Sequence, residues 1–169
     1  AAVTPKIKVA DPKYNAGEIC KKIDEAIAEG AKLIVFPELC ITGYTCGDLF
    51  AQNALIQKAE EALEDIVDGC LEEGKKVVVF ARFVPEIDSI AKMLEKNNIG
   101  YSLIKGDVTD RAEQVQQFQT DPNIKVFIGQ LQTTGMGLTL TEDDPDYVLV
   151  AFDTTLDYAK MCKVCDFIR

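Results

Sequence analysis

The run from Gly74 to Ala81 (GKKVVVFA) constrains the fold more than any other stretch of the sequence. A short apolar run rich in β-branched residues, entered from a glycine, is typical of a strand that is buried on both faces of a parallel sheet. Similar runs stand at 33–36, 101–104, 124–128 and 147–151, with helical patterns between them. Strand and helix alternate along the chain, and this alternation predicts an α/β fold with a parallel sheet.

A further strand is predicted from Val3 to Ala10, which brings the expected number to six. The helices are predicted at about 15–29, 48–73, 85–94, 109–120 and from Thr154 or Thr155 to the end of the chain. We therefore expect residues 1–169 to form one α/β domain. It should be a Rossmann-like, three-layer open sheet of about six largely parallel strands with helices on both faces.

Capping residues set the expected helix ends. Asn15, followed by Glu18 three residues later, predicts the start of the first helix. Gly30 is expected at the position just after its end, and Thr109 is expected to cap a later helix. Gly69 lies inside the long helical pattern at 48–73, where glycine costs about 1 kcal/mol relative to alanine. We expect a helix break or a splice point there.

Charge and composition exclude several classes of function. The net charge of −10 opposes a sequence-independent grip on a phosphate backbone, so nucleic acid is not an expected partner. No run reaches the roughly 18 apolar residues of a membrane span, and the N-terminal stretch is too polar for a signal peptide. A cytoplasmic location is expected, or soluble recombinant expression if the chain is engineered. Histidine is absent, which excludes Ser-His-Asp and Cys-His catalysis and imidazole metal ligands.

The remaining candidate ligands do not make a site. Six cysteines stand at 20, 40, 46, 70, 162 and 165, and most fall in patterned segments, as small apolar packing residues do in a reducing compartment. Cys162 and Cys165 share one face of a predicted helix without a second pair, which favours packing over zinc or redox chemistry. The acidic stretch at 142–146 lacks the glycine and terminal glutamate of an EF-hand. We predict no metal site and no cofactor.

Residues 1 to about 67 resemble the start of the nitrilase-like (carbon–nitrogen hydrolase) domain, specifically the glutaminase half of glutamine-dependent NAD synthetase. The resemblance is carried by residues 2–7, 31–44 (AKLIVFPELCITGY) and 46–49. It implies that Glu38 is the general base of a triad with a lysine and a nucleophilic cysteine further along the chain. The sequence leaves the family pattern before either partner, and neither Cys40 nor Cys46 occupies the nucleophile motif. Glu38 is therefore a vestigial candidate.

Residues about 74 to 141 resemble the second RecA-like lobe of a superfamily-two helicase of the chromatin-remodeller or phage type. The resemblance is carried by residues 77–83, 101–107, Arg111, Gln114, 125–130 and 133–141. The last of these resembles helicase motif V, which implies that Thr133, Gly135 and Gly137 are vestigial candidates for nucleotide or nucleic-acid binding. The family's arginine-finger helix is not matched at 157–169, and no G-x-x-x-x-G-K-[ST] occurs. The sequence therefore lacks the residues that ATP hydrolysis requires.

The chain combines fragments that resemble two unrelated families, and each fragment lacks the catalytic residues of its family. This combination suggests an engineered or computationally assembled α/β protein, with a seam near 67–75. We predict no catalytic residue and no binding partner, and we leave the oligomeric state open. Three alternatives remain. They are a residual amidase built on Glu38 with Cys40 or Cys46, a helicase-derived nucleotide or nucleic-acid binding module, and a natural mosaic.

Overall fold

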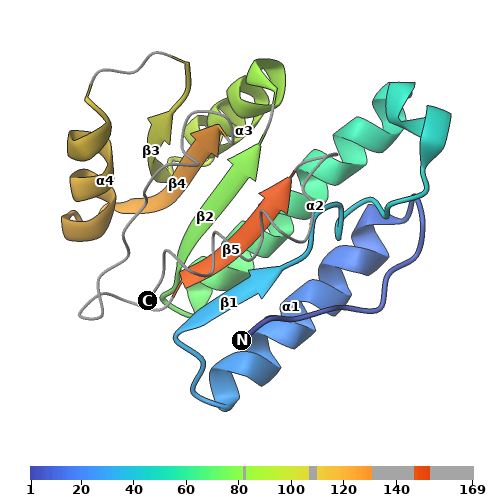
Figure 1. Ribbon diagram of the computed structural model, residues 1–169, viewed down its shortest axis with the longest axis horizontal. Coiled ribbons are helices and arrows are strands. Elements are labelled where there is room, and N and C mark those ends of the chain that lie inside the picture. The colour runs from blue at the N-terminus through green and yellow to red at the C-terminus, as the bar shows by residue number, and fades with distance from the viewer. Residues whose placement is uncertain (82, 107–109, 131–146, 153–169) are drawn as a thin grey trace. The chain divides into compact units, whose positions relative to one another are not determined.

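The computed structural model describes the chain except for residues 82, 107–109, 131–146 and 153–169 (Figure 1). Its helices are α1 (Pro12–Ala28), the 3-10 helix η1 (Gly47–Ala51), α2 (Asn53–Glu72), α3 (Val84–Lys96) and α4 (Arg111–Thr120). Its strands are β1 (Leu33–Phe36), β2 (Lys76–Ala81), β3 (Gly100–Ile104), β4 (Ile124–Gln130) and β5 (Tyr147–Phe152). The predicted α/β class is confirmed. The described residues contain five strands, so the predicted count of six is not confirmed.

The chain divides into two compact units, and β2 crosses the division between Val77 and Val78. The first unit holds Ala1–Val77 and β5 as far as Ala151. The second holds the rest of β2 together with α3, β3, α4 and β4.

In the first unit, β1 and β5 pair in parallel. Leu33 lies opposite Tyr147, and Phe36 lies opposite Val150. Helices α1 and α2 lie side by side and pack against each other (Figure 1). Their buried faces include Ile19, Ile23 and Ala26 of α1 and Leu55, Ala59, Ala62, Leu63, Ile66, Val67 and Cys70 of α2.

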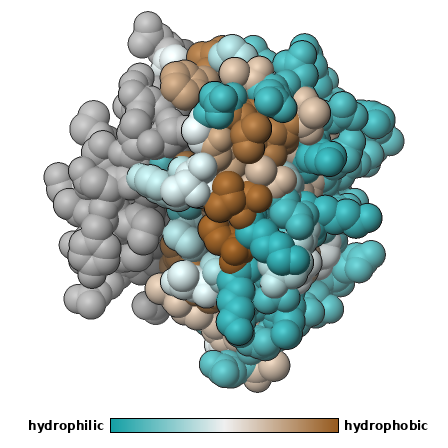
Figure 2. Space-filling view, turned by 90° about the vertical axis from the view of Figure 1, so that its right-hand side faces the viewer, coloured by the Kyte–Doolittle hydropathy of each residue, from teal (hydrophilic) through white to brown (hydrophobic). Residues whose placement is uncertain are grey.

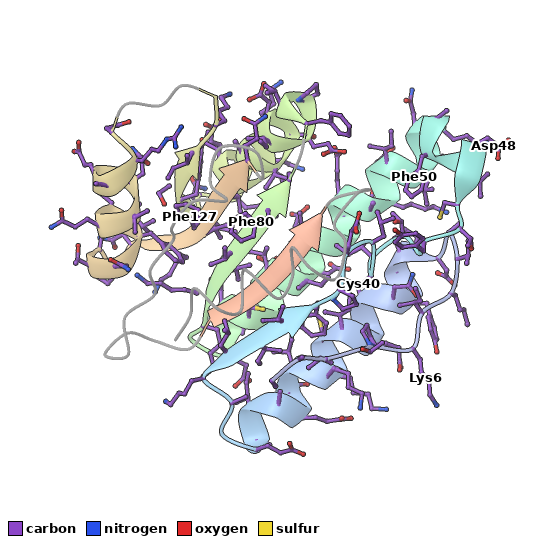
Figure 3. The ribbon with its side chains drawn as sticks, viewed as in Figure 1. Lys6, Cys40, Asp48, Phe50, Phe80 and Phe127 are labelled. Carbon is purple, nitrogen blue, oxygen red and sulfur yellow. The ribbon has the colours of Figure 1, made fainter. Side chains whose placement is uncertain are left out.

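In the second unit, the strand order is β2-β4-β3, and β3 pairs in parallel with β4. All six residues of β2 are buried, which requires that both faces of the strand are covered and confirms the prediction for this run. Both α3 and α4 pack against β3 and β4. Phe118 of α4 is fully buried, and its ring centroid lies 5.5 Å from that of Phe127 on β4 (Phe127 is labelled in Figure 3).

The outer strand of this unit, β3, has a side-chain partner for its backbone. Gln114 of α4 accepts a hydrogen bond through Oε1 from the Leu103 N–H at 3.3 Å. Unpaired backbone groups at a sheet edge are templates for pairing with another chain. At Leu103, this edge is therefore already bonded to a side chain of the same unit.

The predicted strand Val3–Ala10 is wrong. Only Ala2 forms a β bridge, in parallel with Val35, and the Val3 N–H donates to the Val35 carbonyl at 2.9 Å. Pro5 has no N–H with which to continue a ladder. Beyond it, Ile7 and Val9 are 41% and 50% exposed, so their alternation buries nothing. Figure 2 shows hydrophobic residues at the surface of the face that lies on the right-hand side in Figure 1.

Several helix ends differ from the prediction. The N-cap of α1 is Asp11, whose side chain accepts from the Tyr14 N–H, and Asn15 lies inside the helix. The pattern at 48–73 is two helices, because Gln52 is extended with φ −95° and ψ 120°. Helix α2 continues through Gly69, so the predicted break is wrong. The cap of α4 is Asp110, and Thr109 lies outside the described residues.

Gly30 ends α1 as predicted. Its φ is +80°, its N–H donates to the Ile27 carbonyl, and the Ala31 N–H donates to the Ala26 carbonyl. These two bonds form a Schellman motif with glycine in the left-handed position. Glycine is favoured there because it has no Cβ to clash with the backbone.

A test of surface electrostatics arises on α2. Partial loss of hydration raises the pKa of Asp68, and the charges of Glu64, Asp65 and Glu72 raise it further. Because the folded pKa lies above the unfolded one, Asp68 lowers the unfolding free energy as the pH rises through its folded pKa. The side chain is exposed, so water screens the repulsion and the effect is small.

We therefore expect Asp68→Asn to raise the unfolding free energy at pH 7 by about 0.3–0.5 kcal/mol, the size of one or two like-charge helix pairs. Urea titrations at pH 7 and pH 3 measure the difference. The gain should vanish at pH 3 and shrink in high salt. Asp48→Asn on η1 is the control, and an equal gain there would contradict the assignment.

Candidate functional site

The only predicted catalytic candidate, Glu38, lies just after the carboxyl end of β1. Parallel sheets place their ligand sites at this end of the strands. The Glu38 side chain is buried, with 8% of its surface exposed. Leu39, the next residue, has a φ of +53°, a left-handed conformation that is unusual for a residue with a side chain. The Gly43 N–H donates to the Leu39 carbonyl at 2.7 Å and closes this turn.

The segment from Glu38 to Cys46, here called the 38–46 loop, is held by the side chain of Asn15. Asn15 Oδ1 accepts from the Lys8 N–H at 2.7 Å, and Nδ2 donates to the carbonyls of Lys8 at 2.7 Å and Ile41 at 2.8 Å. Asn15 is fully buried. One side chain of α1 therefore binds the N-terminal segment and the 38–46 loop together.

Two further contacts close the loop against the N-terminal segment. The Ala10 N–H donates to the Thr42 carbonyl at 2.8 Å. A Cβ on Gly43 would lie 3.1 Å from Val9 Cα, and the φ of Gly43 is +90°, so this position requires glycine for both reasons. The loop around Glu38 is thus a closely packed turn.

The two cysteines beside Glu38 are packed as small apolar residues. Cys40 is 2% exposed, and burial raises its pKa to about 12 (Cys40 is labelled in Figure 3). Cys46 is also buried, and its thiol donates to the Thr42 carbonyl at 3.1 Å and the Gly43 carbonyl at 3.4 Å. A catalytic cysteine needs a stabilised thiolate that its substrate can reach. Neither thiol has that environment.

The candidates from the helicase resemblance, Thr133, Gly135 and Gly137, lie outside the described residues. Among the described residues, the Gly106 N–H donates to Gln130 Oε1 at 2.8 Å and links the ends of β3 and β4. Lys105 forms an ion pair with Asp88 of α3. This cation at the end of β3 therefore already has an anionic partner.

No group of three or more histidine, cysteine, aspartate or glutamate residues is arranged to hold a metal ion within the described part of the chain. Cys162, Cys165 and the acidic stretch 142–146 lie outside that part. None of the helices that the structure describes is long and apolar enough to cross a membrane.

Sequence reasoning missed Asn15 as the residue that organises the 38–46 loop. A signal was present, because Asn15, Ile19 and Ile23 recur at intervals of four residues. That spacing places Asn15 on the buried stripe of the helix rather than at its cap. A polar residue on a buried stripe must find hydrogen-bond partners inside the protein.

Two family profiles match large parts of the chain. The carbon–nitrogen hydrolase profile matches residues 1–104, and the helicase conserved C-terminal domain profile matches residues 58–155. The chain belongs to both families. Their matches overlap over 58–104, a range that contains the predicted seam.

Curated relatives divide in the same way. Glutamine-dependent NAD(+) synthetase of Mycobacterium tuberculosis is 37% identical over 67 residues, covering 40% of this chain and 10% of that protein. DNA repair protein rad8 of Schizosaccharomyces pombe is 37% identical over 71 residues, covering 41% of this chain and 6% of that protein. Helicase SWR1 of Yarrowia lipolytica is 26% identical over 144 residues, covering 84% of this chain and 7% of that protein. The chain spans a tenth or less of each relative.

Among solved structures, the C-terminal part of the Fun30 ATPase domain is similar, with a TM-score of 0.54 and 14% identity. The similarity covers 92% of this chain and 45% of that one. At this identity it shows the fold alone, an α/β lobe of the RecA-like kind.

The pairing of β1 with β5 joins the two families inside one unit. Strand β1 lies only within the carbon–nitrogen hydrolase match, and β5 lies only within the helicase match. Their parallel register runs from Leu33 opposite Tyr147 to Phe36 opposite Val150. Strands from both families therefore lie side by side, and the predicted chimera-like character of the chain is confirmed.

Proposed function

We propose that the chain is an engineered or computationally assembled α/β protein, and that its role is to form this fold rather than to catalyse the reaction of either family. The parallel pairing of β1 with β5 carries the proposal, because it makes the two fragments complete one sheet. We further propose a single domain with the seam near 67–75. The four described cysteines are free, which fits a reducing cytoplasm.

The packing around Glu38 argues against the amidase alternative. Acyl transfer needs a nucleophile, a base and an oxyanion stabiliser that converge on one point. Burial raises the pKa of Cys40 to about 12, so this thiol is protonated at pH 7. Cys46 directs its thiol at two backbone carbonyls. Glu38 therefore has no reactive thiol beside it in the 38–46 loop.

The second candidate is a helicase-derived module that binds a nucleotide or a nucleic acid. The helicase match over residues 58–155 and the RecA-like fold favour it. The net charge of −10 and the Lys105–Asp88 ion pair oppose a grip on phosphates. We rank it below the structural role for these reasons.

The test is a set of activity and binding assays on the full chain. We expect flat progress curves with glutamine, a simple amide and ATP at high protein concentration. Amide turnover that disappears in Glu38→Gln would overturn the proposal in favour of the amidase. Salt-dependent retention on single-stranded DNA that weakens in Thr133→Ala would instead establish the binding module.

A further inference from the structure

Three large apolar side chains are exposed where the N-terminal segment meets the 38–46 loop. Ile7 is 41% exposed, Val9 is 50% exposed and Tyr44 is 64% exposed. A Cβ on Gly43 would lie 3.1 Å from Val9 Cα and 3.5 Å from Val9 Cγ2. The residue before Tyr44 therefore packs against Val9.

The backbone of Lys8 places Ile7 on the same side of the segment as Val9. The Lys8 N–H donates to Asn15 Oδ1 at 2.7 Å, and the Lys8 carbonyl accepts from Asn15 Nδ2 at 2.7 Å. One side chain can bond both groups only if they point the same way, as they do in an extended residue. The two neighbours of an extended residue direct their side chains to one face. Ile7, Val9 and Tyr44 therefore lie together on the first unit, and we call them the apolar patch.

Two exposed lysines alternate with the apolar residues of this segment. The ammonium of Lys8 lies 3.8 Å from the centroid of the Tyr14 ring, and Lys6 extends away from the ribbon (Figure 3). Within the described residues, neither lysine forms an ion pair, whereas Lys22 and Lys105 each pair with a carboxylate. The positive charge beside the apolar patch is therefore not neutralised.

Acidic residues are missing from both stretches of chain that form this surface. Residues 1–10 and 39–47 contain no aspartate or glutamate, although the chain has 28 acidic and 18 basic residues. The next acidic residue, Asp11, caps α1 by accepting from the Tyr14 N–H. At physiological salt, exposed charges more than about 8 Å apart are largely screened. The two lysines rather than the net charge of −10 therefore set the potential that a ligand meets here.

We propose that the apolar patch, Lys6 and Lys8 form an interaction surface for a short, acidic, amphipathic peptide segment of a partner protein. Apolar side chains of the peptide cover Ile7, Val9 and Tyr44, and its carboxylates pair with the two lysines. The backbone of Lys8 is already bonded to a side chain of α1, so side chains rather than an added strand hold the peptide. A surface of this size fits a weak, transient complex. It adds a partner to the structural role proposed above.

Other occupants match these residues less well. A protein that grips nucleic acid makes about 6–10 contacts to phosphates, and Ile7 and Val9 offer none. A second copy that meets this surface through a two-fold axis brings the lysines against their own counterparts. Like charges then oppose the contact. A segment that carries both carboxylates and apolar side chains matches both parts of the surface.

The probe is a fluorescein-labelled peptide of about twelve residues, in which every third residue is leucine or phenylalanine and the others are glutamate. We expect its fluorescence anisotropy to rise with the concentration of the full chain at physiological salt, with a dissociation constant on the order of 10–100 μM. Two further peptides are controls. One has serine in place of the apolar residues, the other has lysine in place of glutamate, and both should bind at least about tenfold more weakly.

Variants locate the binding site. Ile7→Ser and Tyr44→Ala should each weaken binding of the acidic peptide about five- to tenfold. Val84→Ser is the matched control for the first, because Val84 of α3 is 42% exposed and lies in the second unit. Lys6→Ala should weaken binding about two- to fivefold, and the loss should shrink in high salt. Lys92→Ala, at an exposed lysine of α3, is its control.

Four results would each overturn the proposal. They are no binding up to about 1 mM chain, equal binding of the serine-substituted peptide, equal losses in Ile7→Ser and Val84→Ser, and tighter binding of oligothymidine than of the acidic peptide. Self-association in sedimentation that Tyr44→Ala abolishes would assign the surface to a second copy, and would overturn it equally. The peptide comparisons use the wild-type chain, so they decide the proposal even where a variant folds poorly.

Discussion

Asn15→Ala should lower the unfolding free energy by about 3–4 kcal/mol, a large fraction of the stability of a domain of this size. The substitution removes three hydrogen bonds, with Lys8 N–H, the Lys8 carbonyl and the Ile41 carbonyl. Each bond contributes about 1 kcal/mol, and a buried backbone group left without a partner costs about 1–3 kcal/mol more. Lys8 is exposed, so water recovers part of the loss at its backbone groups. Urea denaturation followed by circular dichroism measures the effect.

Asn53→Ala is the matched control, because Asn53 is an exposed asparagine in the first turn of α2. It should change the unfolding free energy by less than about 0.5 kcal/mol. Hydrogen exchange separates a local from a global effect, since the Ala10 and Gly43 amides, which donate to Thr42 and Leu39, should lose protection in Asn15→Ala. A variant as stable as the wild type would show that Asn15 does not hold the 38–46 loop.

The role of Asn15 shows what sequence patterns convey about this fold and what they do not. Its preference for helix N-caps predicted a boundary, but its place on the stripe with Ile19 and Ile23 decides its structure. The partners lie 7 and 26 residues away in the sequence. Local propensity carries no information on such contacts, whereas the helical period does.

Helices and strands could be predicted because the spacing of apolar residues and the glycines that end helices are local features of the sequence. Gly30 and Gly74 both have positive φ just after a helix, where glycine is favoured. The alternation in Val3–Ala10 failed because a strand needs a partner as well as a pattern. Asn15 supplies the bonds to Lys8 that a neighbouring strand would otherwise make.

The candidate site was predictable only in its position. The family resemblance identified Glu38, and the end of β1 is where a parallel sheet places such a residue. Cys40 is 2% exposed and follows Leu39, whose left-handed conformation nothing in the local sequence requires. The burial of Cys40 and Cys46 agrees with the sequence-based expectation that most of the cysteines are small apolar packing residues.

The two families could be joined because their secondary structure has the same period. Parallel α/β units repeat a strand, a helix and a second strand, with a hydrophobic face on each helix. Both profiles match residues 58–104, which span most of α2 together with β2, α3 and β3. A segment that satisfies both patterns is a natural place for one fragment to replace the other.

Phe118→Ala should lower the unfolding free energy by about 3–5 kcal/mol, the usual cost of removing a fully buried phenylalanine. Phe118 is the one buried residue of α4, so it is the main apolar anchor of this helix. Its ring packs against Phe127 with a centroid separation of 5.5 Å and an interplanar angle of 50°. Aromatic pairs in such geometry add about 0.5–1.5 kcal/mol beyond the buried area.

The consequence should extend to the edge of the sheet. If α4 undocks, Gln114 can no longer accept from the Leu103 N–H, and the outer side of β3 becomes open to pairing with another chain. We therefore expect Phe118→Ala to aggregate faster than the wild type, as measured by light scattering below the unfolding transition. Phe118→Leu should lose less stability because it retains an apolar anchor.

Gln116→Ala on the exposed face of α4 is the control, and it should leave both the denaturation midpoint and the scattering unchanged. Amide exchange of Gln117, Phe118 and Thr120 should accelerate in Phe118→Ala ahead of that of β2, because α4 opens locally before the buried strand does. Uniform acceleration in α4 and β2 would mean that Phe118 contributes to one cooperative core rather than to the docking of a single helix. An unchanged midpoint would contradict the anchoring role itself.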